Sequence, residues 1–500
     1  MNISHCWSPL HPVVLLSTKN AIFVEGNSLF LETFVNSIRL RTSYPLKFTY
    51  YFGEWCMKQL FALLLFLSPL AASFGQTTLS LNQSVQIALD KNVTVRQAQN
   101  NIEAAQSGVL AAYGSYLPSL SANGAWQRQQ NDGPVSQRII GGFPISSGGF
   151  SVTNSFTTGI SAGYTVFDGF SREATYKRAV AGATSSDNFF ARTKQQIVFQ
   201  VQSDYLAVLK NEQLVKVFEE NLKRDKRELD RITESNKVGA LSIADVYRQQ
   251  SIVASDELGL LQNQNTFDES KADLIALIGM DVSQEYVIAD SSISPVISDA
   301  ELDAMKDTYT KMDQFSKEAL AVRPDYQSAL AGLQGAQAEE TAAKGKYYPH
   351  VNAFAGYSFN NQLIANLTQD KGINWGVQIS WSLFDNFLTN QSIQTAAVDR
   401  QNAELSVLQT ERNINVDVKK ALLNLESARK QYSASVKSVQ SATQDQKVQE
   451  ERYSLGAGTL VDLLTANAGL VNAQAGKVNA TYNYIFAKRN LEFAVGKISY

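Results

Sequence analysis

The segment INWGVQISWSLFD, at residues 373–385, gives the clearest indication of the fold. Its first nine residues alternate apolar side chains such as Ile373, Trp375 and Val377 with small or polar ones, a period of two that is typical of a strand with one apolar face. The first half of the chain contains a matching stretch, FTTGISAGYTVFD, at residues 156–168. Weaker alternation precedes each stretch. We therefore expect one two-strand hairpin in each half, at about residues 117–168 and 348–385.

These two hairpins belong to an internal duplication. Pro118 and Pro349 open the paired strands, and Asp168 and Asp385 close them. From these aspartates it is 77 residues in both halves to a second aspartate, Asp245 or Asp462. The spacing differs only inside the hairpins, where the first half has 14 extra residues within 129–155. Glycine pairs there predict turns and an exposed loop.

Long helices follow both hairpins. Residues 171–237 contain no proline and one glycine, which allows on the order of 100 Å of helix. Val198, Val201, Tyr205 and Val208, and in the second half Val416 and Leu423, fall on stripes at heptad-like spacing. Gly239 and Gly456 interrupt the pattern, and the helix-start signatures Ser242 to Asp245 and Thr459 to Asp462 follow them. We expect antiparallel coiled-coil helices at about 169–279 and 386–496.

The N-terminal part has the pattern of an export signal. Met57 and Lys58 precede a short apolar run, and small residues end at Gly75, as a signal peptidase requires. We predict a signal peptide at 57–75 and an upstream extension at 1–56 that is absent from the mature protein; a genuine N-terminal domain is the alternative. The mature chain then has a first repeat at 76–280, a linker at 281–316 and a second repeat at 317–500.

Composition argues against catalysis and nucleic-acid binding. Lys+Arg 44 and Asp+Glu 47 give a formal charge of -3, without a basic run for phosphate contacts. The cysteines, Cys6 and Cys56, and all histidines except His350 precede the predicted signal peptide. We therefore expect no catalytic residues, no metal site, no cofactor and no nucleic-acid partner.

The strand count favours an oligomer. The alternation alone also fits a soluble sheet with one buried face, but helices this long must pack on each other and cannot be covered by a two-strand hairpin. In lipid, four strands per chain leave two open edges, so several chains must share one barrel. Two chains would give eight strands and a filled interior, whereas three would give twelve and room for a lumen.

The order of these motifs resembles the TolC family of outer-membrane efflux proteins over about residues 79–500. The elements that carry the resemblance are the helix from Leu81 to Leu89, the two Phe-Asp strand ends, and the segment RYSLGAGTLVDLL at 452–464. The resemblance implies a mixed α and β membrane protein: a homotrimer with a 12-strand β-barrel in the outer membrane of a Gram-negative bacterium and an α-helical tube in the periplasm. The linker would pack around the middle of the tube.

The resemblance also implies function and partners. The protein would be a passive conduit in a tripartite efflux or type I secretion system, in contact with outer-membrane lipid. An inner-membrane RND, MFS or ABC transporter would drive it through a periplasmic membrane-fusion adaptor. An exported structural coiled-coil or adhesin protein is the alternative, which leaves the duplicated hairpins unexplained.

A constriction is expected at the periplasmic helix turns. In the family an aspartate matching Asp462 projects into the pore, and three copies would form a ring of carboxylates. The family's second acidic ring falls on Thr465, and its latch arginine falls on Gly458. Tyr453 matches a latch tyrosine, whose partner would lie near Asp245. We expect a gate that is less acidic and less firmly latched. The alternative role for Asp245 and Asp462 is helix capping.

Overall fold

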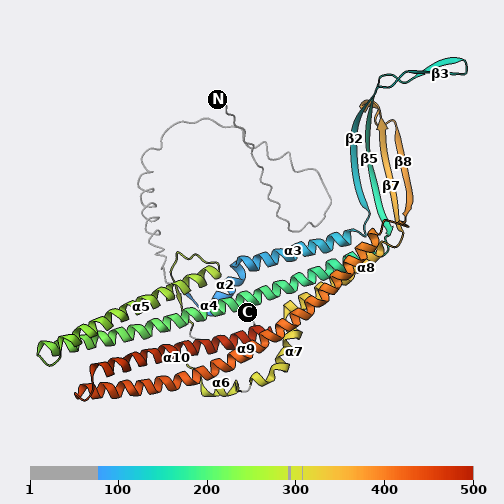
Figure 1. The fold of residues 1–500 in the computed structure, drawn as a ribbon. Coiled ribbons are helices and arrows are strands. Elements are labelled where there is room, and N and C mark those ends of the chain that lie inside the picture. The colour runs from blue at the N-terminus through green and yellow to red at the C-terminus, as the bar shows by residue number, and fades with distance from the viewer. Residues whose placement is uncertain (1–76, 291–293, 307, 499–500) are drawn as a thin grey trace, which may run out of the picture. The chain divides into compact units, whose positions relative to one another are not determined.

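The computed structural model describes residues 77–290, 294–306 and 308–498. The predicted extension and signal peptide lie outside these residues. Figure 1 shows the order of the elements. The strands are β1 (Thr77–Leu79), β2 (Ser119–Asn131), β3 (Ser136–Ile140), β4 (Phe143–Ser147), β5 (Ser151–Phe167), β6 (Tyr286–Ile288), β7 (His350–Asn361) and β8 (Lys371–Ser380). The helices are α2 (Leu81–Lys91), α3 (Val93–Gly114), α4 (Ser171–Lys237), α5 (Ile243–Leu277), α6 (Asp299–Ala304), η1 (Thr308–Lys311), α7 (Met312–Val322), α8 (Pro324–Gly345), η2 (Ile364–Asn366), α9 (Leu388–Ser454) and α10 (Leu460–Val495).

Both predicted hairpins lie in one antiparallel sheet with the strand order β2-β5-β7-β8. The halves meet at β5 and β7, where Ala162 faces Ala355. The sheet is open in the chain, since β2 and β8 are its edges among the described residues. In the second half the strand ends at Ser380, not at Asp385 as predicted. β8 has one neighbouring strand, whereas β5 pairs on both sides and continues to Phe167.

The predicted loop at 129–155 contains regular structure that the sequence pattern did not predict. β2 continues to Asn131, and β3 and β4 form a second, separate hairpin. Its turn is Gly141-Gly142, with φ of +64° and +86°. A two-residue turn with positive φ at both positions matches the twist of antiparallel strands, which explains the glycine pair.

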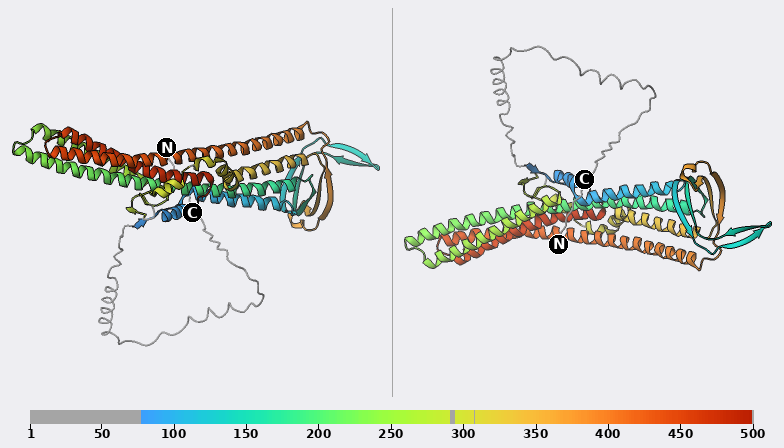
Figure 2. Two further views of the ribbon diagram at one scale, coloured as in Figure 1. Left: turned by 90° about the horizontal axis from the view of Figure 1, so that it is seen from below. Right: turned by 90° about the horizontal axis from the view of Figure 1, so that it is seen from above.

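The long helices begin and end close to the predicted positions. α4 and α9 each contain 67 residues and α5 and α10 contain 35 and 36. α4 packs against α5, and α9 packs against α10. Within the described part of the chain, Figure 2 shows the sheet at one end of α4 and α9 and the helix turns at the other. Within the described ranges, no helix combines the length and the apolar character needed to cross a membrane.

The apolar stripe of the first half is confirmed, and that of the second half is wrong. Val198, Val201, Tyr205 and Val208 are all buried. Val416 and Leu423 are instead 49% and 50% exposed. The buried face of α9 is formed by Ile414, Val418, Ala421, Leu422 and Leu425. Two residues spaced by seven do not distinguish between the faces of a helix that has apolar side chains on more than one face.

The segment predicted as a linker is partly regular. β6 pairs in parallel with β1, and the Tyr205 hydroxyl donates a hydrogen bond of 2.9 Å to the main-chain oxygen of Leu79 beside them. Leu302 of α6, Ala319 of α7 and Ile297, just before α6, belong to the core around α9 and α10. α7 begins at Met312, before the predicted start of the second repeat at 317.

Four helices lie side by side in the order α3, α4, α8, α9. This spatial order matches that of the strands to which they connect, β2, β5, β7 and β8. α4 and α8, from different halves, make the central contact, where the hydroxyl oxygens of Ser185 and Ser328 are 2.8 Å apart. The duplicated counterparts of α8 and α4 are α3 and α9. These two helices form the outer edges of the row.

Candidate functional site

The turn between α9 and α10 is held by a complete capping box. Gly456 has φ of +72°, and Thr459 is the N-cap of α10. The Thr459 hydroxyl accepts from the main-chain nitrogen of Asp462 at 3.2 Å, and the Asp462 carboxylate accepts from the main-chain nitrogen of Thr459 at 3.2 Å. Hydrogen bonds from Thr459 and the charge of Arg452 lower the pKa of Asp462. Its exposed carboxylate is therefore ionised at neutral pH.

The turn between α4 and α5 differs in its cap. Gly239 has φ of +80°, and the Ser242 hydroxyl accepts from the main-chain nitrogen of Ala244 at 3.1 Å. The capping hypothesis expected the Asp245 carboxylate to complete a capping box, and it does not. This carboxylate instead pairs with Arg248 Nη1 at 3.0 Å. An arginine one turn along the helix offers a charged donor, so this carboxylate turns away from the N-cap.

A small apolar cluster joins the two turns. Ile232 of α4, Val246 of α5 and Leu460 of α10 are its buried members, and Tyr453 packs against it. The Tyr453 hydroxyl is buried without a hydrogen-bond partner among the described residues. The Arg231 guanidinium lies 4.9 Å from the centre of its ring. Burial and the carboxylates of Glu228 and Asp245 raise the pKa of Tyr453, and Arg231 lowers it.

The structure thus brings Tyr453 near Asp245, but the residue in contact with its ring is Arg231, which sequence reasoning missed. The one sequence feature that could have indicated Arg231 is its position three residues after Glu228. The two side chains form an ion pair of 2.6 Å. Gly458 lies in the turn, where an added Cβ would come within 3.2 Å of Arg452 Cβ. Thr465 is exposed one helical turn after Asp462, and its hydroxyl donates to the main-chain oxygen of Val461 at 2.8 Å.

The strand-to-helix junctions repeat a four-residue unit. Asp168 accepts from the main-chain nitrogen of Arg172 at 2.9 Å, and Asp385 accepts from that of Thr389 at 2.8 Å. In both halves the phenylalanine before the aspartate meets a second phenylalanine, Phe170 or Phe387, edge to face at 5.5 Å. Both of these have left-handed φ, +67° and +66°. The sequence motifs FDGF at 167–170 and FDNF at 384–387 contain this second phenylalanine, but its role was not predicted from them.

Pro118 and Pro349 stand at the opposite junctions, directly before β2 and β7. Proline suits the first position of a strand because it has no N–H to leave unpaired. The tripeptides before these prolines form the turns that end α3 and α8, where Tyr348 donates its main-chain N–H to the oxygen of Gly345 at 3.0 Å.

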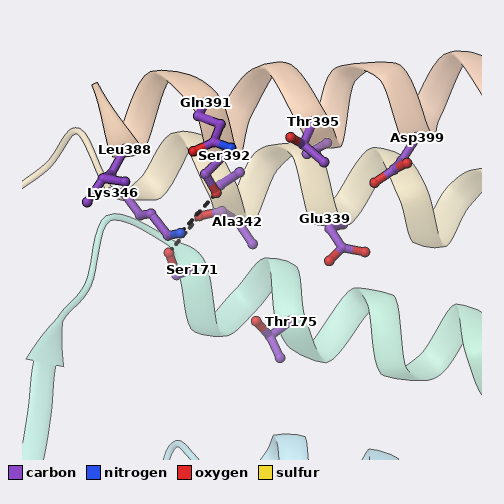
Figure 3. Close-up of a pocket in the computed structure, with 12 residues that line it drawn as sticks. Ser171, Thr175, Glu339, Ala342, Lys346, Leu388, Gln391, Ser392, Thr395 and Asp399 are labelled. Carbon is purple, nitrogen blue, oxygen red and sulfur yellow. Dashed lines mark hydrogen bonds between the residues drawn. The ribbon is translucent and has the colours of Figure 1, made fainter. Parts of the chain in front are cut away.

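A polar pocket of about 500 Å³ lies beside these junctions, between the ends of α4, α8 and α9 (Figure 3). Lys346 Nζ donates to Ser392 Oγ at 2.9 Å, and the Ser171 hydroxyl donates to the main-chain oxygen of Ala342 at 3.0 Å. Glu339 and Asp399 supply carboxylates to the same wall. The Ser171 bond joins α4 to α8, and the Lys346 bond joins the end of α8 to α9, so these contacts hold the three helix ends together.

Comparison with known proteins identifies the class of this molecule. Residues 84–280 and 315–497 match the family model for the outer membrane efflux protein. The chain is 25% identical over 391 residues to the pyoverdine export outer membrane protein OpmQ of Pseudomonas aeruginosa, covering 77% of this chain and 78% of that protein. It is 22% identical over 454 residues to the outer membrane protein TolC of Escherichia coli, covering 89% and 87%.

Solved structures share the fold. The outer membrane channel CmeC of Campylobacter jejuni superposes with a TM-score of 0.69 at 19% identity, covering 83% of this chain and 85% of that one. The family predicted from the motifs is confirmed. The chain belongs to the outer membrane efflux protein family, whose members are outer-membrane channel proteins and not enzymes.

Proposed function

We propose that three copies of the chain form one duct, with a 12-strand barrel in the outer membrane and a helical tube in the periplasm. The observation that carries this proposal is the open four-stranded sheet with an exposed apolar face. Ile373, Trp375, Val377 and Ile379 of β8 are between 65% and 81% exposed. In lipid, unpaired edges of β2 and β8 would be too costly, so β8 of one copy pairs with β2 of the next.

The row of helices supports the same closure. α4 packs against α8 inside the chain, and their duplicated counterparts α9 and α3 are left at opposite edges. Apolar side chains on α9 are exposed along this edge: Val398, Leu405, Leu408, Val416 and Leu423. Leu110 and Tyr113 on α3 are exposed as well. α9 of one copy can therefore pack on α3 of the next as α4 packs on α8. Three copies give the twelve strands that leave room for a lumen.

The gate lies at the helix turns. Asp462 is exposed and ionised, so three copies would place a ring of fixed negative charge at the periplasmic end, which favours cations over anions. Thr465 adds no second charge. Tyr453 with Arg231 packs the two hairpins of one chain together where the family's latch arginine is replaced by Gly458. We infer a gate held mainly by this apolar and cation–π contact within the chain.

The duct itself is passive. An inner-membrane transporter of the RND, MFS or ABC class would supply energy and substrate through a periplasmic adaptor that docks on the helix turns. The similarity to a pyoverdine export protein supports efflux of small molecules as the task. An ABC partner would instead make the protein part of type I secretion of polypeptides.

Single-channel recording of the purified protein in planar bilayers tests the proposal. Asp462→Asn removes the charge and keeps an acceptor for Thr459, so we expect reduced cation selectivity with unchanged folding. Glu219→Gln, an exposed charge on α4 far from the turns, is the matched control and should leave selectivity unchanged. Channels with equal selectivity before and after Asp462→Asn would refute the gate, and a protein that forms no channel at all would refute the duct.

A further inference from the structure

Two carboxyl groups face each other inside the α4–α5 hairpin. Asp225 of α4 is 3% exposed, and it lies within hydrogen-bonding reach of Asp256 of α5. Asp225 Oδ1 and Asp256 Oδ2 are buried, and neither accepts a hydrogen bond from any described residue. Two ionised carboxylates in this position would repel each other away from water, which costs far more than the same contact at the surface. One proton between them removes the repulsion and turns two unpaired acceptors into a hydrogen bond.

The surrounding charges do not replace this proton. Arg224 Nε is 3.8 Å from Asp225 Oδ1, too far for a hydrogen bond, and another nitrogen of this guanidinium donates to Asn221. On the exposed side, Lys226 and Glu257 neutralise each other at 2.7 Å. Gln249 is fully buried and donates to the main-chain oxygen of Asp225 at 3.0 Å, leaving the Asp225 carboxyl without that donor.

The neighbouring helix α10 adds no cation. Between Leu463 and Gly476 its sequence contains no charged residue, and Asn467, buried on this helix, contributes only an amide. The pair is therefore enclosed by apolar and amide groups with one arginine at its margin. A buried acidic pair of this kind is stable when one of its members is protonated.

We propose that Asp225 and Asp256 form a proton-binding site that joins α4 to α5 and makes the packing of this hairpin depend on pH. Nothing in the proposed duct requires this site, because it lies within one chain and away from the turn that carries Asp462. The site binds a proton, and protonation is expected to change the distance between α4 and α5.

The direction of the pH dependence follows from the raised pKa of Asp225 in the folded hairpin. Burial and the hydrogen bond with Asp256 raise the pKa of Asp225 to about 7. The folded hairpin therefore holds a proton that the unfolded chain releases near the ordinary value of 3.8. The contribution to stability is complete below that value and is lost as the pH rises through about 7. The helices should be close in mild acid and should loosen in mild alkali.

The test is a distance measurement between spin labels on exposed positions of the two helices. Labels at Lys223→Cys and Ser255→Cys flank the pair, with Cys6 and Cys56 replaced by serine, in the full chain diluted with unlabelled chain. Between about pH 5 and about pH 9 we expect the distance distribution to shift to longer values with its midpoint near the pKa of Asp225. Asp225→Asn and, separately, Asp256→Asn should abolish the shift, because an amide donates to a carboxylate without a titrating proton.

The matched control is Glu257→Gln, next to Asp256 on the exposed side, which should keep the shift. A distribution that does not change with pH in the original chain would overturn the proposal, as would an equal shift in both asparagine variants.

Discussion

Arg323 is a charged residue in the core, and its surroundings explain how it is tolerated there. Its guanidinium binds Asp325 through two nitrogens at 3.0 and 2.6 Å, Asp417 at 3.2 Å and the main-chain oxygen of Ala494 at 3.1 Å. Arg192 lies 4.1 Å above the ring of Phe493 nearby, and burial with the charge of Arg323 lowers its pKa to about 10. These contacts join α4, α8, α9 and α10 where the two halves meet.

Arg323→Met should destabilise the protein strongly. The change leaves Asp325 without its main partner, and loss of one member of a buried ion pair costs about 3 kcal/mol or more. Asp417 is half exposed, so Asp417→Asn should cost much less, because water replaces the lost charge. Thermal unfolding of the purified protein measures both variants. An equal and small decrease in Tm for the two would contradict the central role of Arg323.

Sequence reasoning could not identify Arg323 or the Asp225–Asp256 pair. Asp417 is 94 residues from Arg323, and Asp256 is 31 residues from Asp225. A charged residue in a helix is usually exposed, and only long-range packing shows which of them is buried. Asp462 was easier, because a helix cap is local and its partner Thr459 is three residues away.

At the scale of elements, the strand-to-helix junctions carry most of the folding information. Each uses two successive residues with positive φ before its long helix, Gly169 and Phe170 in the first half and Asn386 and Phe387 in the second. A Cβ on Gly169 would overlap the main-chain oxygen of Gly345. The first junction therefore requires glycine for space, whereas the second needs only a residue that tolerates the left-handed region.

The two junctions should respond differently to substitution. Gly169→Ala introduces both backbone strain and a clash with α8, so we expect a loss of about 2 kcal/mol or more. Asn386→Gly removes no packing and keeps the conformation, so its effect should stay within about 0.5 kcal/mol. Tm values of the two variants provide the comparison. Equal losses would show that the contact with Gly345 does not determine the first junction.

The helices were predictable because their signals are local and long. Absence of proline, the glycine turns and the capping signatures place α4 and α9. The end of β8 was not predictable, because it depends on strand pairing, and β8 has only β7 as a neighbour among the described residues. The prediction for Val416 and Leu423 was wrong because two residues spaced by seven fit more than one face of α9. They have the spacing of a buried stripe, but within one chain they face outward.

For the whole molecule, the duplication predicts where copies of the chain would meet in the proposed trimer. Ser185 and Ser328 meet where α4 packs on α8, with their hydroxyl oxygens 2.8 Å apart. Counted from Asp168 and Pro349, the corresponding positions at the edges are Asn402 on α9 and Gln97 on α3, and both are exposed in the chain. If three copies close a ring by repeating the α4–α8 contact, Asn402 of each copy meets Gln97 of the next.

Disulfide formation between Asn402 and Gln97 of neighbouring copies tests the proposed trimer. The variant carries Gln97→Cys and Asn402→Cys, with Cys6 and Cys56 replaced by serine, and is oxidised in isolated outer membranes before electrophoresis without reductant. Ser185→Cys with Ser328→Cys is the control for the same contact within a chain and should leave the protein at the mass of a monomer. We expect the variant with Gln97→Cys and Asn402→Cys to form a covalent trimer and nothing larger. A product that remains monomeric, or a ladder that continues beyond three chains, would contradict it.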